Sequence, residues 1–280
     1  MGEHIIEAMG KAKVIIKDGK VVEVGDPKIE YCPLFHKHRG IEKINKKAIR
    51  ENMEFRIADF GMCTDKRIVK MKDFLSFGIS ETLSTLLSVN MIDCAIMVCE
   101  GCGTVIITEG EMAQGVGGRV SGLSKTSTIP EIHEKIGKEN VLDKKTAKIN
   151  QIDGIKLAKS LGYKNIAVTI TNPEEAKLIR NLEQKYKNNG KNINIYIFSV
   201  HTTGASKEEA QKLFDYCDVV TACASKPIRE IGEKIATKKV GESIPIYGAT
   251  EKGKEFLELR VEKIGGMKPK KDPKLPKPLI

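Results

Sequence analysis

The chain has 280 residues, of which 40% are hydrophobic and 30% are charged. This balance is typical of a globular protein with a substantial core. No run of about 18 apolar residues is present, and no apolar segment follows the acidic start, so the sequence predicts neither a membrane span nor a signal peptide. We therefore expect a cytoplasmic protein.

The net charge is +10, and much of it lies in residues 267–280, which hold five lysines and a single aspartate. Such a basic, proline-containing tail is either solvated or touches an acidic partner or nucleic acid. Few aromatic residues lie near basic clusters, which argues against a stacking platform for single-stranded nucleic acid. We therefore do not expect nucleic acid as the partner.

The first half of the chain, residues 1–145, indicates mixed α and β structure. Residues 11–24 predict a β-hairpin that turns at Asp18-Gly19, and Pro33 favours an extended or turn segment around it. Hydrophobic spacing and short β-branched runs predict the remaining elements: helices over 46–57 and 66–89, the second with a break near Phe77-Gly78, and strands over 93–98 and 104–108. Loops rich in cysteine and glycine connect them.

From about residue 150 the pattern becomes regular. Strands are expected over 165–170, 193–200, 217–222 and 244–247, each followed by a helix. Asn172 with Pro173, and Ser206 with Glu209, are typical helix starts. Strands that alternate with helices at this spacing indicate parallel βαβ units. The sequence thus predicts an α/β fold with a Rossmann-like region over 146–266, whose sheet is mainly parallel, and a tail over 267–280.

Seven cysteines are present, an odd number that argues against a disulfide framework. The sharpest local pattern is Cys99-x-x-Cys102, where Gly101 and Gly103 allow the backbone to curl so that both sulfurs face one point. Cys32 and Cys63, in segments marked by proline or glycine, are the natural further ligands of a [4Fe–4S] cluster or zinc. A redox dithiol and ordinary buried cysteines remain alternatives.

Polar residues follow three of the predicted parallel strands, at the edge where such sheets bind ligands. They are Thr171, then His201, Thr202 and Thr203, then Cys223 and Ser225. The helices that follow point their N-termini at the same edge, which favours a phosphate- or carboxylate-bearing ligand. His201 and Cys223 are the candidate catalytic residues. The alternative is that these residues only cap helices or pack in the core.

A glycine-rich segment offers a second anion site. Gly115, Gly117 and Gly118 precede Arg119, which can clamp an anion with two parallel hydrogen bonds, and Ser121 follows. The segment matches neither a Walker A motif nor a dinucleotide fingerprint. It is interpreted either as an anion-binding loop or as a structural turn.

Several segments together resemble one known family, methanogenesis marker protein 8, which is largely confined to methanogenic archaea. They are residues 31–35 (YCPLF), 54–57 (EFRI), 59–63 (DFGMC), 73–81 (DFLSFGISE), 115–122 (GVGGRVSG) and 221–226 (TACASK). The resemblance spans nearly the full chain. It implies a role near methyl-coenzyme M reductase or its maturation machinery, in assembly, activation, modification or cofactor supply. The resemblance identifies no catalytic residues in this chain.

Three functions are therefore open. The first is an iron–sulfur or metal-binding accessory factor for methyl-coenzyme M reductase. The second is a small-molecule enzyme that binds an anionic ligand at the carboxyl edge of its sheet. The third is a non-catalytic subunit of a larger complex.

Overall fold

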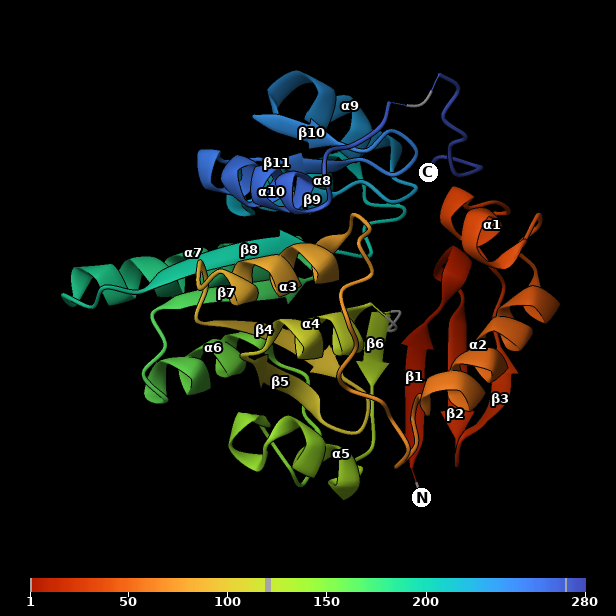
Figure 1. The fold of residues 1–280 in the computed structure, drawn as a ribbon, viewed down its shortest axis with the longest axis horizontal. Helices are drawn as coiled ribbons and strands as arrows, with labels where there is room; N and C mark the ends of the chain where they lie inside the picture. The colour runs from red at the N-terminus through yellow and green to blue at the C-terminus, as the bar shows by residue number, and fades with distance from the viewer. Residues whose placement is uncertain (1, 119–121, 270) are drawn as a thin grey trace.

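The computed structural model describes residues 2–118, 122–269 and 271–280, and within them the chain forms two β-sheets (Figure 1). The smaller sheet has the order β3-β2-β1-β6. Its strands are β1 Glu3–Glu7, β2 Lys13–Lys17, β3 Lys20–Val24 and β6 Gly122–Lys125. The β2–β3 hairpin confirms the predicted turn, since Asp18 and Gly19 both have positive φ, the backbone that a two-residue hairpin favours.

The larger sheet has seven strands in the order β10-β11-β9-β8-β7-β4-β5. Its members are β4 Cys94–Cys99, β5 Gly103–Ile107, β7 Asn165–Ile170, β8 Asn194–Ser199, β9 Val219–Thr221, β10 Lys238–Val240 and β11 Ile246–Gly248. The four central strands β4, β7, β8 and β9 are parallel, and the other pairs are antiparallel. The predicted α/β class is therefore confirmed, in a mixed sheet that includes β4 and β5 from before residue 146.

Helices cover both faces of this sheet, and each face has its own apolar core. One face packs against α3 Ile79–Ser88, α4 Gly110–Gly117, α5 Pro130–Ile136 and α10 Glu251–Lys263. The opposite face packs against α6 Gln151–Ser160, α7 Pro173–Asn188, α8 Lys207–Tyr216 and α9 Lys226–Ile235. Buried apolar residues on both faces of the parallel strands explain their near-continuous hydrophobic sequence.

The smaller sheet carries α2 Lys46–Phe60 on its outer side, with α1 Pro33–Arg39 nearby (Figure 1). A third core lies between this sheet and α2. The sheet stands beside the carboxyl ends of β7 and β8 (Figure 1). Lys11, in the 3-10 turn η1 Met9–Lys11, connects the two parts, because its Nζ donates to the carbonyl of Thr203 at 2.6 Å.

Some local expectations are wrong. Residues 66–78 are not helical, because Arg67 is fully buried and donates to the carbonyls of Ile68, Gly115 and Val116, contacts that hold the segment across α4. Pro33 begins helix α1 instead of fixing an extended segment, a position that needs no N–H.

The tail is not wholly solvated. Lys277 pairs with Tyr31 in an isolated bridge, and Ile280 exchanges backbone hydrogen bonds with the segment around Ala224 and Lys226 at 2.9 and 3.0 Å. The tail therefore ties the start of α1 to the start of α9. Among the described residues, no helix is long and apolar enough to cross a membrane.

Candidate functional site

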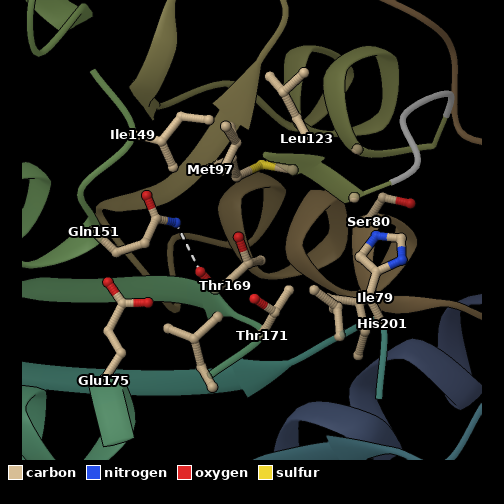
Figure 2. Close-up of a pocket in the computed structure, with 15 residues that line it drawn as sticks. Ile79, Ser80, Met97, Leu123, Ile149, Gln151, Thr169, Thr171, Glu175 and His201 are labelled. Atoms are coloured by element: carbon tan, nitrogen blue, oxygen red, sulfur yellow. Dashed lines mark hydrogen bonds between the residues drawn. The ribbon is translucent and has the colours of Figure 1, made fainter. Parts of the chain in front are cut away.

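A cavity of about 170 Å³ lies at the carboxyl ends of β4, β7 and β8. Its polar lining comes from Ser80, Gln151, Thr169, Thr171, Glu175 and His201. Met97, Leu123 and Ile149 supply an apolar wall (Figure 2). The cavity therefore sits where parallel α/β sheets bind their ligands.

Three helices begin at this cavity, and they differ in how their first turns are capped. Asn150 caps α6 and Asn172 caps α7, each through its side-chain oxygen. Helix α3 begins after Gly78, which has no side chain to accept a hydrogen bond. No side-chain oxygen caps the first turn of α3, but that turn carries the buried carboxylate of Glu81, which accepts from the Ser80 hydroxyl at 2.8 Å and offsets the positive end of the helix dipole.

Gln151 fixes the wall between β4 and β7. Its Nε2 donates to the Thr169 carbonyl at 2.7 Å, and its Oε1 accepts from Thr104 at 2.8 Å. Gln151 is buried, and both ends of its amide are satisfied within the protein. It therefore shapes the cavity as a rigid support rather than as an available donor.

Glu175 lies on α7 at the same end of the cavity as Gln151 (Figure 2). Burial raises the pKa of its carboxyl above the usual range, although a hydrogen bond from the Gln151 backbone N–H opposes this rise. Among the described residues, no Lys, Arg or His forms an ion pair with Glu175. A partly buried carboxylate without a cation is costly, and such groups concentrate at functional sites.

His201 lies at the other end of the cavity, beside Ile79 and Ser80 (Figure 2). Its backbone has φ of +56°, which non-glycine residues rarely adopt and which surrounding structure must hold in place. Burial lowers the pKa of its imidazole to about 4, and the positive charges of Arg56 and Lys11 act in the same direction. The ring is therefore neutral at pH 7 and sits in a positive potential.

The structure brings His201 and Thr171 to one cavity, as the sequence predicts, but it separates them from the other expected edge residues. Thr202 donates to the Thr221 carbonyl. Thr203 accepts from the Ala224 N–H at 3.3 Å. Ser225 caps α9 by accepting from Ile228 at 3.4 Å. The hydroxyls of Thr202 and Thr203 thus join the segments that follow β8 and β9, and none of the three residues lines the cavity.

Cys223 follows β9 and also has positive φ, +44°. Burial raises the pKa of its thiol, and the backbone N–H groups of Thr202 and His201, which face the sulfur, offset only part of this rise. At neutral pH the thiol stays protonated, and it lies outside the cavity lining. Cys32 is buried at the start of α1, and this burial raises the pKa of its thiol, which lies near Cys223.

The Cys99-x-x-Cys102 turn lies deep in the core, with both thiols fully buried. Cys99 and Cys102 are hydrogen-bonded to each other, and this contact and burial raise the pKa of Cys99. The buried Glu100 between them accepts from Arg67 at 3.2 Å, and its charge also raises the pKa of Cys63. Three of the four predicted metal ligands thus surround Glu100, whereas Cys32 lies near Cys223.

Among the described residues, no group of three or more His, Cys, Asp or Glu side chains is arranged to hold a metal ion. Glu100 nevertheless has one buried carboxylate oxygen, Oε1, with no hydrogen-bond partner there.

The expected glycine loop is instead the end of α4. Gly115 and Gly117 are helical. A Cβ on Gly115 would lie 2.2 Å from the Val69 carbonyl oxygen, and one on Gly117 would lie 2.6 Å from Met97. Both glycines therefore serve close packing, although Gly117 also lines the cavity. Gly118 is the C-cap, and Arg119 and Ser121 lie outside the described residues.

Sequence reasoning missed Gln151 and Glu175. Each comes in the first turn of a helix that an asparagine caps, so the signal was present in the spacing from Asn150 and Asn172. It missed Lys11 and Arg56 for a different reason. These cations belong to the smaller sheet and its helix, and only the folded chain brings them close to β8.

The arrangement offers a ligand-sized space with a neutral imidazole at one end and a carboxylate at the other. A search of sequence families matches residues 4–262 to a family described as "Uncharacterized protein conserved in archaea (DUF2099)". The chain belongs to this archaeal family. It is also 46% identical over 260 residues to the uncharacterized protein MJ0054 of Methanocaldococcus jannaschii, which covers 92% of this chain and 90% of the relative.

Proposed function

We propose that this DUF2099 protein is an enzyme that binds a small anionic molecule in the sheet-edge cavity and transfers a proton on it through His201. The observation that carries the proposal is that Thr171 and His201, which follow adjacent parallel strands, line the same cavity. That edge is the common ligand site of open α/β sheets.

The cavity limits the ligand to a small molecule. Its volume is about 170 Å³, whereas an apolar cavity of about 150 Å³ holds benzene. A group of roughly six to eight non-hydrogen atoms therefore fits inside it. Thr171 lines the cavity and is exposed, so the cavity opens to solvent there and a small molecule can enter.

The charge at the His201 end favours an anion. The positive charges of Arg56 and Lys11 both act on His201 there. An anion bound at this end opposes the two cations and raises the pKa of His201 from about 4 toward neutral. His201 then becomes a general acid/base only when the ligand is present.

Calorimetric titration with butanoate and with inorganic phosphate tests the proposal. We expect saturable binding of at least one of them by the wild-type protein, and loss of binding in Thr171→Trp, which fills the mouth. Thr146→Trp is the matched control, because Thr146 is an exposed threonine in a loop that does not line the cavity. Unchanged binding in Thr171→Trp would contradict the proposal.

A second candidate is the metal-binding accessory factor, and one observation favours it. Three thiols, Cys63, Cys99 and Cys102, lie around the unpartnered Oε1 of Glu100, and thiolates with a carboxylate suit zinc or an iron–sulfur cluster. Anaerobic purification with iron, zinc and sulfide analysis tests it. We rank it second, because Cys99 and Cys102 are fully buried and do not line the sheet-edge cavity.

The finer family assignment is also a proposal. The residues that resemble methanogenesis marker protein 8 support a place for this archaeal family in methanogenesis, as an accessory to methyl-coenzyme M reductase. Co-purification of the tagged protein from a methanogen, with methyl-coenzyme M reductase enriched over an untagged control, tests that role.

A further inference from the structure

The two ends of the cavity carry opposite electrostatic character. Figure 2 shows Gln151 and Glu175 at one end, His201, Ile79 and Ser80 at the other, and Thr171 between them. A ligand that spans the cavity therefore meets two different environments, and each selects one functional group.

The acidic end is built to hold a positive or hydrogen-donating group. The Glu175 carboxylate accepts one backbone N–H, from Gln151, which leaves most of its acceptor capacity open. Lys148 and Lys156, which are close to Gln151 in sequence, form ion pairs with Asp153, at 2.8 and 2.9 Å, and not with Glu175. A ligand ammonium group would satisfy the charge that the described residues leave uncompensated.

The opposite end cannot take that group. The charges that act on His201 from its surroundings are both positive, from Lys11 and Arg56. Lys11 is held in place by its 2.6 Å hydrogen bond to the Thr203 carbonyl. A carboxylate or similar anion is stabilised at this end, and an ammonium group is repelled.

We infer that the ligand is a small bipolar molecule with its anionic group at the His201 end and an ammonium group, separated from it by a short chain, at Glu175. This inference rests on the proposed function, which it deepens by naming the ligand class. An ω-amino acid meets the requirement. A 2-amino acid does not, because both of its charges lie at one end of the molecule.

Four probes of nearly equal size test this inference by calorimetry or ligand-observed NMR on the full chain. They are 4-aminobutanoate, its isomer 2-aminobutanoate, butanoate, and butylamine. We expect 4-aminobutanoate to bind about tenfold more tightly than butanoate, a difference of about 1.4 kcal/mol. We also expect 2-aminobutanoate to bind no better than butanoate, and butylamine to bind most weakly.

Two variants test which end of the cavity binds which charged group of the ligand. Glu175→Gln keeps an acceptor for the Gln151 backbone N–H but removes the charge. We expect this variant to bind 4-aminobutanoate only as tightly as butanoate, and to bind butanoate with the affinity of the wild type. Lys11→Met should weaken the binding of 4-aminobutanoate and of butanoate by the same factor. The control is Glu174→Gln. Glu174 precedes Glu175 on α7, is exposed, and pairs with Lys212 at 2.6 Å. This variant should bind all four probes with the affinities of the wild type.

The outcomes separate the two proposals. If butanoate binds and 4-aminobutanoate binds no better, the bipolar inference fails while the anion site stands. If both amino acid isomers bind alike, the required separation of charges is wrong. If none of the four probes binds to the wild-type protein, both the inference and the proposed function fail.

Discussion

At the scale of single residues, the protein keeps the His201 imidazole neutral at mildly acidic pH, where a free histidine is protonated. Its pKa is about 4, because burial and the charges of Arg56 and Lys11 penalise the imidazolium. The backbone of His201 is also strained. Strain and a displaced pKa in one cavity residue are typical of a functional group whose position is maintained by the rest of the fold.

This state predicts a specific pH dependence. Since the folded pKa lies below the unfolded value of 6.5, the unfolded chain binds more protons between these values, and stability falls as pH drops from 6.5 to 4. The loss from His201 is at most about 3 kcal/mol. His201→Gln should remove that part of the pH dependence in urea unfolding, while His38→Gln on α1 should remove a smaller part, because burial and neighbouring cations lower the pKa of this exposed histidine as well. An equal slope in His201→Gln and wild type would contradict this.

At the scale of elements, Arg260 on α10 fixes the segment that leads into α3 and the cavity. Arg260 is fully buried. Its guanidinium binds both oxygens of Asp73 at 2.6 and 2.7 Å and donates to the Ser76 carbonyl. These hydrogen bonds hold the pKa of Asp73 well below its usual range. Ile79 and Ser80 therefore keep their place at the cavity through a residue near the end of the chain.

Arg260→Met should destabilise the protein by about 3 to 5 kcal/mol, because it leaves Asp73 and the Ser76 carbonyl without their buried partner. Lys263→Met is the control: Lys263 also pairs with Asp73, at 3.3 Å, but its side chain is 34% exposed, so the change should cost less than about 1 kcal/mol. Urea unfolding measures both. Equal losses would show that Arg260 contributes no more than a surface ion pair.

How far the sequence predicts an element depends on where its partners lie. The hairpin turn at Asp18 and the capped helix after Asn172 follow from local residues, and both were predictable. The extended run before α3 was not, because its conformation depends on Arg67 and Arg260, whose partners are far away in sequence. For the same reason, the predicted strands gave the correct positions of Thr171 and His201 at the sheet edge, whereas Lys11 and Arg56 could not be placed there from the sequence.

At the scale of the whole molecule, the seven cysteines occupy different layers of the fold. Six are buried, and Cys223 alone is partly exposed; all seven lie in the described residues and are free thiols. The cavity instead joins the two sheets, since Gly122 and Leu123 of β6 line it together with the ends of the larger sheet's strands. The site is therefore a property of the complete chain rather than of either sheet.

Thiol titration tests this distribution. A small aromatic disulfide reagent should react with one thiol per native chain, slowly at neutral pH because burial raises the pKa of Cys223, and with seven after unfolding in denaturant. Cys223→Ser should abolish the native reaction. Several rapidly reacting thiols in the native protein, or fewer than seven after unfolding, would contradict the described burial.

The most direct test of the central claim is the pKa of His201 measured by NMR with and without saturating butanoate, with the imidazole signals assigned by comparison with His201→Gln. We predict a pKa near 4 in the free protein and a rise of about one unit or more when the anion binds, because it offsets the charges of Lys11 and Arg56. An imidazole that titrates at the same pH in both states would contradict an anion site at His201.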